Sequence, residues 1–416
     1  MKADQIELMA PAGSFEAMQA AIDNGANSIY FGIDQLNMRA VASINFTLND
    51  LAEIARRCKK ANVKTYITLN TIIYDHDLSV IKRIVDAAIK NGIDAIIASD
   101  QAVLNYAFTA GMEVHISTQL NVTNIETVKF YAHFADVMVL SRELSMQQIT
   151  KICDEIIKQD IKGPKGKLVE IEIFGHGALC MAVSGKCYLS LHTANSSANR
   201  GACKQNCRKK YTVKDEDGNE LEIDNEYIMS PKDLCTLDFL DKIIDTGIKV
   251  LKIEGRGRAA DYVAKTIKSY REAIDSVYEG TYTTEKVEAW MTHLSEVYNR
   301  EFWGGYYLGK ELGEWSDKPG SLATQVKVFV GKGMHYYKKS KIAQFKLNSH
   351  KIQIGDTILI TGPTTGAKEF VIETMMVDEK NTEVAIKGQE VTIPVDFVVR
   401  PSDKMYKLEK TEYAEI

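Results

Sequence analysis

One stretch decides how most of this chain is interpreted: Asn91-Gly92-Ile93-Asp94-Ala95-Ile96-Ile97-Ala98-Ser99. A glycine after a helical pattern can adopt the left-handed backbone conformation that closes a helix without a steric penalty. The run Ala95–Ser99 that follows is aliphatic up to its last residue, as expected for a strand that is covered on both faces. The stretch therefore predicts the end of a helix, a glycine stop and a buried strand.

The same unit recurs along the chain, at Asn24-Gly25-Ala26, Ala110-Gly111-Met112 and Thr246-Gly247-Ile248. Eight strands are predicted in all: Ile6–Met9, Ser28–Gly32, Lys64–Leu69, Ala95–Ser99, Glu113–Ser117, Val137–Leu140, Glu170–Phe174 and Val250–Ile253. Eight strands that alternate with helices predict an α/β fold, a TIM-like (β/α)8 barrel, which typically needs around 250 residues. A doubly wound open sheet is the alternative, but the turn Met9–Ser14 lacks the glycine pattern G-x-G-x-x-G.

One connection is much longer than the others. Roughly 75 residues separate Phe174 from Val250, far more than an ordinary link between a strand and a helix. We therefore expect an insertion after strand seven, over about residues 175–249. Such an insertion emerges at the C-terminal face of a barrel, where these folds keep their active sites.

The 416 residues exceed the usual size of one domain. We expect the barrel and its insertion to occupy residues 1–310. From Thr324 onward, apolar and polar residues alternate along the chain. Turn signals such as Gly331-Lys332-Gly333 separate the alternating segments. Residues 322–408 are therefore predicted to form a C-terminal, small all-β barrel domain.

Composition narrows the class of protein. With 51 Lys and Arg against 56 Asp and Glu, the net charge is −5, which excludes a globally basic nucleic-acid binder but not a local basic patch. No apolar run approaches the ~18 residues that span a bilayer. Met1 to Leu8 lacks the apolar core of a signal peptide. We expect a cytoplasmic protein without a membrane partner.

Seven cysteines are the most informative feature of the composition. Cys58 and Cys153 lie in helical patterns and are expected to be buried small hydrophobes. The other five all fall in the insertion: Cys180, Cys187, Cys203, Cys207 and Cys235. Thiolates bind zinc or iron–sulfur clusters, and the spacing leaves both open. Only Cys203 and Cys207 approach the close spacing of a zinc pair.

Four motifs around these cysteines resemble the signature of the collagenase-like peptidases, known as unclassified peptidase family 32. They are His176-Gly177-Ala178-Leu179-Cys180, Ser184-Gly185-Lys186-Cys187, Asn199-Arg200-Gly201-Ala202-Cys203 and Lys232-Asp233-Leu234-Cys235. The resemblance implies a barrel with a 4Fe–4S cluster at its mouth. It also implies oxygen-independent hydroxylation of tRNA uridine, of ribosomal RNA cytidine or of the ubiquinone ring.

The length and the β region are most similar to the tRNA branch of this family. That resemblance implies an enzyme that makes 5-hydroxyuridine at the tRNA wobble position and depends on prephenate, a dicarboxylate. The family pattern implies Cys180, Cys187, Cys203 and Cys235 as cluster ligands. Local spacing favours Cys207 beside Cys203, so Cys207 is the alternate fourth ligand.

Polar residues follow several predicted strands and are expected to meet at the barrel mouth. The candidates for catalysis are Gln119, Arg142, His176, Glu254 and Arg256, with Asn70, Asp100, Thr118 and Glu143 beside them. The guanidinium groups of Arg142, Arg256 and Arg258 suit a dicarboxylate or a phosphate. A structural alternative is that Glu254 pairs with Arg256 or Lys252. We expect Arg256, as a loop residue, to add little stability.

Two basic segments are candidates for RNA contact. One is Lys204, Arg208, Lys209 and Lys210; the other is Tyr336, Tyr337, Lys338, Lys339, Lys341 and Lys346. The expected partners are tRNA, a dicarboxylate and a protein partner or paralogue. Two other functions stay open: a peptidase that pairs Cys187 with His176 or His192, and a zinc-stabilised non-enzymatic partner protein. The peptidase motifs H-E-x-x-H and G-x-S-x-G are absent.

Overall fold

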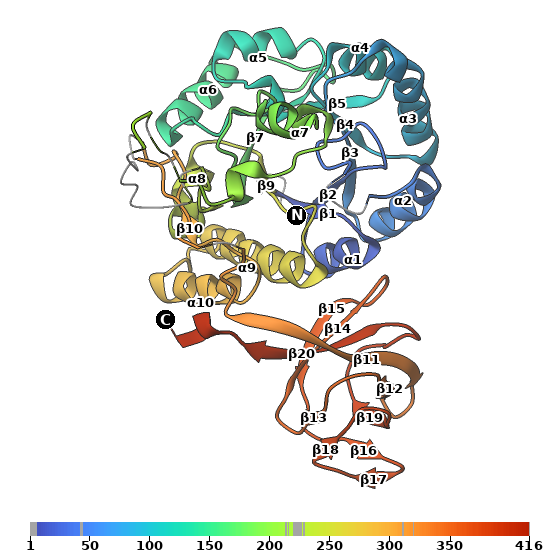
Figure 1. Ribbon diagram of the computed structural model, residues 1–416. Coiled ribbons are helices and arrows are strands. Elements are labelled where there is room, and N and C mark those ends of the chain that lie inside the picture. The colour runs from blue at the N-terminus through green and yellow to red at the C-terminus, as the bar shows by residue number, and fades with distance from the viewer. Residues whose placement is uncertain are drawn as a thin grey trace.

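A computed structural model describes residues 6–41, 45–212, 214, 216–218, 227, 229–309, 312–318 and 320–415. It shows a ring of strands surrounded by helices, with a β region beside it (Figure 1). Eight parallel strands close the ring because the last of them pairs with both the first and the seventh. They are β1 (Glu7–Ala12), β2 (Ser28–Phe31), β3 (Lys64–Leu69), β4 (Ala95–Ala98), β5 (Glu113–Ile116), β6 (Val137–Val139), β7 (Glu170–Ala178) and β9 (Val250–Ile253). The predicted TIM-like barrel and all eight of its strands are confirmed.

Helices cover the outside of the ring, and most of the core lies between the helices and the strands. They are α1 (Phe15–Asp23), α2 (Leu51–Lys60), α3 (Leu78–Asn91), α4 (Gln101–Thr109), α5 (Ile125–Tyr131), α6 (Met146–Lys158), α8 (Leu240–Asp245) and α9 (Ala260–Tyr278), with α10 (Thr284–Ser295) packed on α9. Gly92 ends α3 in the left-handed conformation, at φ 71°. The glycine stop therefore has the conformation that the sequence predicts.

The described part of the insertion after β7 contains the short helix α7 (Leu189–Ala194) and the strand β8 (Asp233–Cys235), and it ends with α8 before β9. Strand β8 runs antiparallel to the long end of β7, with Cys235 opposite His176. Strand β10 (Phe302–Trp303) then pairs with β8. The sequence does not predict this pairing, which builds the end of the insertion into the barrel wall.

The C-terminal region is antiparallel, as predicted, and has its own apolar core. Its sheet contains β11 (Gln325–Tyr337), β12 (Ile342–Leu347), β14 (Thr357–Gly362), β15 (Gly366–Val371), β16 (Met376–Val377), β17 (Lys380–Asn381), β19 (Glu390–Pro394) and β20 (Lys404–Lys410); β13 (Ile352–Gln353) pairs with β18 (Val384–Ala385). Strand β15 packs on α1 and α9, and Lys368 pairs with Asp23 at 2.8 Å.

The boundaries at residues 310 and 322 remain predictions, and Lys310 lies outside the described residues. Between them, Glu314–Ser316 is bound to the insertion: the Lys232 amide donates to the Glu314 carbonyl, and the Ser316 amide to the Ser230 carbonyl. The junction is therefore partly held by backbone hydrogen bonds. Within the described ranges, every helix is too short or too polar to cross a bilayer.

A tyrosine on α9 joins β7 to β8. The hydroxyl of Tyr270 donates to the Gly175 carbonyl at 2.8 Å and accepts from the Thr236 amide at 3.0 Å, fully buried. Because Tyr270→Phe leaves both groups without this partner, we expect it to lower the free energy of unfolding by about 1–3 kcal/mol. Urea unfolding measures this change.

The matched control is Tyr106→Phe, since the Tyr106 hydroxyl binds Asp86 at the surface. This change is expected to stay within about 0.5 kcal/mol of the wild type. Equal stabilities for the two variants would show that the buried hydroxyl does not hold the junction.

Candidate functional site

A cavity of about 310 Å³ opens at the C-terminal end of the barrel strands. Its walls come from the ends of β2, β3, β5, β6, β7 and β9 and from the insertion. Of the residues proposed from sequence, it brings together Gln119, Arg142, Glu254, Arg256, Cys180, Cys187, Cys203 and Cys207. His176 and Cys235 are not among its lining residues.

Charge is distributed very unevenly around this cavity. Among the described lining residues, Glu254 is the sole carboxylate, whereas seven side chains are cationic: Arg39, Arg142, Arg208, Lys252, Arg256, Arg258 and Arg300. Three of these cations have a carboxylate partner: Arg39 pairs with Glu254, Lys252 with Glu172 and Arg300 with Asp233. The cavity therefore favours an anionic ligand.

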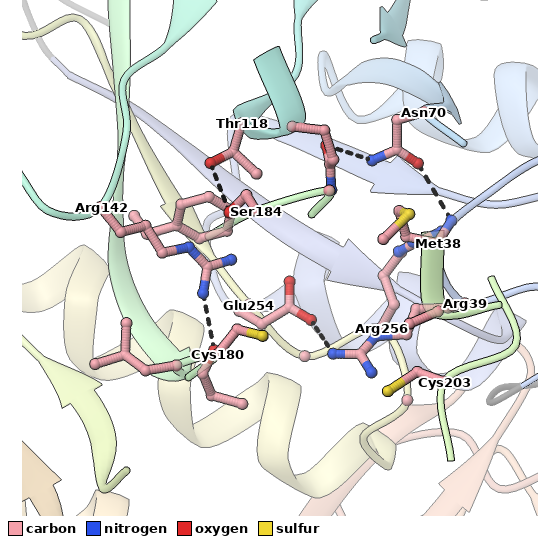
Figure 2. A pocket seen from close by; sticks show the side chains of 18 of the residues that line it. Met38, Arg39, Asn70, Thr118, Arg142, Cys180, Ser184, Cys203, Glu254 and Arg256 are labelled. Carbon is pink, nitrogen blue, oxygen red and sulfur yellow. Dashed lines mark hydrogen bonds and ion pairs between the residues drawn. The ribbon is translucent and has the colours of Figure 1, made fainter. Parts of the chain in front are cut away.

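Glu254 follows β9 and points into the cavity (Figure 2). Its carboxylate accepts from Arg39 at 3.0 Å and from the Tyr30 hydroxyl at 3.1 Å. Burial alone would raise the pKa of Glu254, but Arg39, Arg142 and Arg256 together lower that pKa to about 2. Glu254 is therefore ionised at every physiological pH, and its ion-pair partner is Arg39 rather than Arg256 or Lys252.

Arg256 is buried, with 5% of its surface exposed. Its Nη1 donates to Asn37 at 3.0 Å and to Thr68 at 2.8 Å. Burial also lowers the pKa of its guanidinium. These contacts speak against the expectation that Arg256 adds little stability, because its buried side chain joins the loop after β2 to strand β3.

Two other arginines lie over the faces of aromatic rings. The guanidinium of Arg142 lies 3.9 Å from the ring of Phe174, and that of Arg258 lies 3.4 Å from the ring of Tyr298. Arg142 donates one bond to the Ala178 carbonyl, and its Nε has no partner among the described residues. Stacking fixes the plane of a guanidinium and leaves its edge for a ligand.

Amide and hydroxyl groups form a polar rim on the β3 and β5 side. The Oε1 of Gln119 accepts from Asn70 at 3.3 Å and from the Ser117 hydroxyl. That orientation leaves the Gln119 amide nitrogen as a hydrogen-bond donor for a ligand. Thr118 and Ser184, in contact at 3.5 Å, join this rim to the insertion.

Other polar residues predicted for the mouth have structural roles. His176 is buried among the rings of Tyr262, Tyr270 and Phe302. Burial and the nearby Arg258 lower the pKa of His176 to about 3, so it is neutral. Asp100 caps α4 through the Ala102 amide, and Glu143 is exposed and bonded to Ser141.

Four thiols share the cavity: Cys180, Cys187, Cys203 and Cys207. The Asn199 side chain accepts from the Cys187 amide at 3.3 Å, and the Gln205 amide donates to the Cys203 sulfur at 3.4 Å. Burial raises the pKa of Cys207, Arg208 opposes this rise, and the other three thiols add to it. The Cys207 thiol is therefore close enough to the other three thiols for their charges to affect its pKa.

Cys235 lies apart from these thiols, in β8. It is 2% exposed, and its sulfur contacts the Tyr270 hydroxyl and the Met291 sulfur, each at 3.6 Å. Burial raises its pKa to about 12. The Cys235 side chain contacts α9 and α10, so Cys207, and not Cys235, shares the cavity with the other three thiols.

Several residues of the cavity were not foreseen: Tyr30, Arg39, Asn199, Tyr298 and Arg300. Tyr30 is the third residue of predicted strand Ser28–Gly32, and its side-chain direction depends on barrel closure. Arg39 lies in the loop after β2, and its position beside Glu254 is set by a pairing across more than 200 residues of sequence. No local pattern marks either residue.

Comparisons with known proteins identify related sequences. The profile of Peptidase family U32 matches residues 13–317. A Porphyromonas gingivalis protein named Collagenase is 53% identical over 413 residues, covering 99% of this chain and 100% of that protein. The tRNA hydroxylation protein P1 of Bacillus subtilis is 30% identical over 412 residues, covering 96% of this chain and 94% of that protein. A 23S rRNA 5-hydroxycytidine synthase of Escherichia coli is 34% identical over 276 residues, covering 66% of this chain and 40% of that protein.

The ionised state of Glu254 makes a prediction about pH. A carboxylate whose pKa is lowered to about 2 on folding stabilises the protein above its unfolded pKa of about 4.3, and this stabilisation is lost as the pH falls toward 2. We therefore expect Glu254→Gln to lower the free energy of unfolding by about 1–3 kcal/mol at pH 7. The difference from wild type should shrink between about pH 4 and pH 2.

Thermal or urea unfolding across this pH range measures the effect. Glu126→Gln is the control, because its side chain is 75% exposed and pairs only with Lys129 among the described residues. We expect this control to stay within about 0.5 kcal/mol of wild type. A Glu254→Gln deficit that is equally large at the acid end would contradict a strongly lowered pKa.

Proposed function

The chain belongs to Peptidase family U32, and on that premise we propose that it is an enzyme that hydroxylates RNA. Relatives at 30% and 34% identity are named as a tRNA hydroxylation protein and an rRNA hydroxycytidine synthase. The observation that carries the proposal is the cavity, in which four thiols and an excess of cationic side chains face one space. A redox centre beside an anion-binding pocket suits the oxidation of a nucleotide.

The donor set suits a 4Fe–4S cluster. Such a cluster takes four cysteine thiolates, and Cys180, Cys187, Cys203 and Cys207 line the same cavity. Within the described part of the chain, no three His, Cys, Asp or Glu side chains stand close enough to hold a single metal ion. We therefore propose these four residues as ligands, with Cys207 in place of Cys235. When bound, the cluster would supply electron transfer.

The chain's own side chains would orient the substrates. Arg142 and Arg258, stacked on rings, are available to bind the carboxylates of a small anion, and the resemblance makes prephenate our candidate. Gln119 can donate from its amide nitrogen to a pyrimidine carbonyl oxygen. Glu254 stays ionised and holds Arg39 in the wall. Together they would place a base and an anion side by side.

Transfer RNA is the RNA that the comparisons favour. The B. subtilis relative matches almost the whole chain, including the C-terminal region, whereas the rRNA relative matches 66% of it. We propose the wobble uridine as the target and 5-hydroxyuridine as the product. The experiment is nucleoside mass spectrometry of tRNA from a strain lacking this protein, with and without the restored gene. Unchanged 5-hydroxyuridine in the deletion strain would refute the proposal.

A peptidase is the alternative, because the relative at 53% identity is named Collagenase. A cysteine nucleophile needs a histidine base within hydrogen-bond reach. No histidine occurs among the described residues that line the cavity, His176 is buried in the wall, and His192 is exposed on α7. The geometry thus favours RNA hydroxylation. Cleavage of gelatin by the purified protein, lost in Cys187→Ala, would support the peptidase instead.

Two cysteine substitutions separate the possible ligand sets. We expect Cys207→Ala to lose iron, sulfide and 5-hydroxyuridine formation together, because a ligand has been removed. Cys235→Ala should keep iron and activity and lose about 1–2 kcal/mol of stability, since it truncates a buried side chain. Iron and sulfide analysis of protein purified without air, combined with the tRNA assay, measures both variants.

The reverse result, with iron lost from Cys235→Ala and kept in Cys207→Ala, would restore the set that the family pattern implies. A colourless wild type that contains zinc would refute the cluster itself.

A further inference from the structure

We propose that RNA docks on the surface of the insertion around the cavity mouth, through exposed lysines and the aromatic side chain of Tyr188. This inference rests on the proposed function and adds to it the surface that receives the RNA. The surface, called the insertion rim below, consists of Met181, Val183, Lys186, Tyr188, Lys204 and Lys209.

The charge of this segment differs from that of the whole chain. The chain carries a net charge of −5, yet residues 173–214 contain no Asp or Glu and seven cationic residues: Lys186, Arg200, Lys204, Arg208, Lys209, Lys210 and Lys214. Arg200 and Arg208 bind groups of the fold itself, Asp77 and the Leu179 carbonyl among them. The lysines of the rim are exposed. An acid-free cationic surface is complementary to a phosphate backbone.

Large apolar side chains are exposed in the same segment of the chain. Tyr188 is 70% exposed, and Met181 and Val183 are each 50% exposed. Rings and thioethers that face solvent beside lysines suit the flat faces of nucleobases, which stack on aromatic side chains regardless of sequence. Apolar side chains that are exposed to water do not stabilise the fold. A group of them therefore indicates an interaction surface.

The rim is fixed at the entrance of the cavity. Val183, Ser184 and Gly185 line the cavity, and Met181, Lys186 and Tyr188 of the same segment are exposed. Asn121 donates to the Ser184 carbonyl at 3.1 Å, and the Ile72 amide donates to the Asn199 carbonyl at 3.1 Å, so the insertion is tied to loops after β5 and β3. An RNA that lies on the rim would have a nucleotide within reach of the four thiols.

The second basic segment, at the turn between β11 and β12, is less well placed. None of its residues Tyr336–Lys341 lines the cavity. It belongs to the C-terminal region, which packs by β14 and β15 against the outer helices α1 and α9 (Figure 1). This turn offers the same residue types away from the mouth, and it therefore provides a matched control.

The test measures binding of a fluorescent, unmodified tRNA transcript by anisotropy at several salt concentrations. The triple change Lys186→Gln, Lys204→Gln and Lys209→Gln is compared with Lys338→Gln, Lys339→Gln and Lys341→Gln in the turn. Tyr188→Ala is compared with Tyr337→Ala, which is 45% exposed in the wild type. Iron content is measured for every variant, so that loss of the cluster is not mistaken for loss of docking.

We expect the triple change in the rim to weaken binding about 10- to 100-fold and to reduce the slope of log affinity against log salt by about 2. Tyr188→Ala should weaken binding about 5- to 100-fold with an unchanged slope, because stacking releases no counterions. Both changes in the turn should bind within about twofold of wild type.

Wild-type affinity in the rim variants, or equal losses in the rim and the turn, would overturn the inference. Neither result touches the proposed function, which fails separately if deletion of the gene leaves tRNA hydroxylation intact. A third outcome is that the wild type does not bind tRNA but binds gelatin, and that the rim variants lose gelatin binding. In that case the partner is a polypeptide and the inference is wrong.

Discussion

The cavity depends on one carboxylate, that of Glu254. Seven cationic side chains converge at the barrel mouth, and guanidinium groups brought this close repel one another unless an anion separates them. Glu254 is held ionised by Arg39, Arg142 and Arg256, and it also accepts from Tyr30. Because the Glu254 carboxylate offsets only part of the positive charge, the cavity has an excess of cationic side chains. A bound anion would neutralise that excess.

Barrel closure creates this concentration of charge. Parallel strands end on the same side of a ring, so polar residues that follow separate strands meet at one mouth. Glu254 and Arg256 come from the end of β9, Arg142 from the end of β6 and Gln119 from the end of β5. Two of the arginines, Arg142 and Arg258, lie over the aromatic rings of Phe174 and Tyr298, which do not neutralise their charge.

The insertion adds the thiols and the outer surface. It leaves the barrel after β7, crosses the mouth and returns as β8, which pairs with the end of β7. The outward part of this path carries Cys180, Cys187, Cys203 and Cys207 to the cavity, and the returning strand buries Cys235 beneath Tyr270. A single segment thus provides the proposed cluster ligands, the tie to the barrel wall and the lysine-rich rim.

The sequence alone determined the barrel, since its signals are local: glycine stops such as Gly92 and continuous aliphatic runs such as Ala95–Ala98 specify helix ends and buried strands by themselves. It also marked Gln119, Arg142 and Glu254 as residues of the mouth, because each follows a strand. Only the tertiary structure placed Cys207 in the cavity with the other three thiols and Cys235 apart from them, showed that His176 does not line the cavity and brought Arg39 to Glu254. Those outcomes depend on strand pairings between residues far apart in the chain, and the direction in which a paired side chain points is not encoded in local spacing.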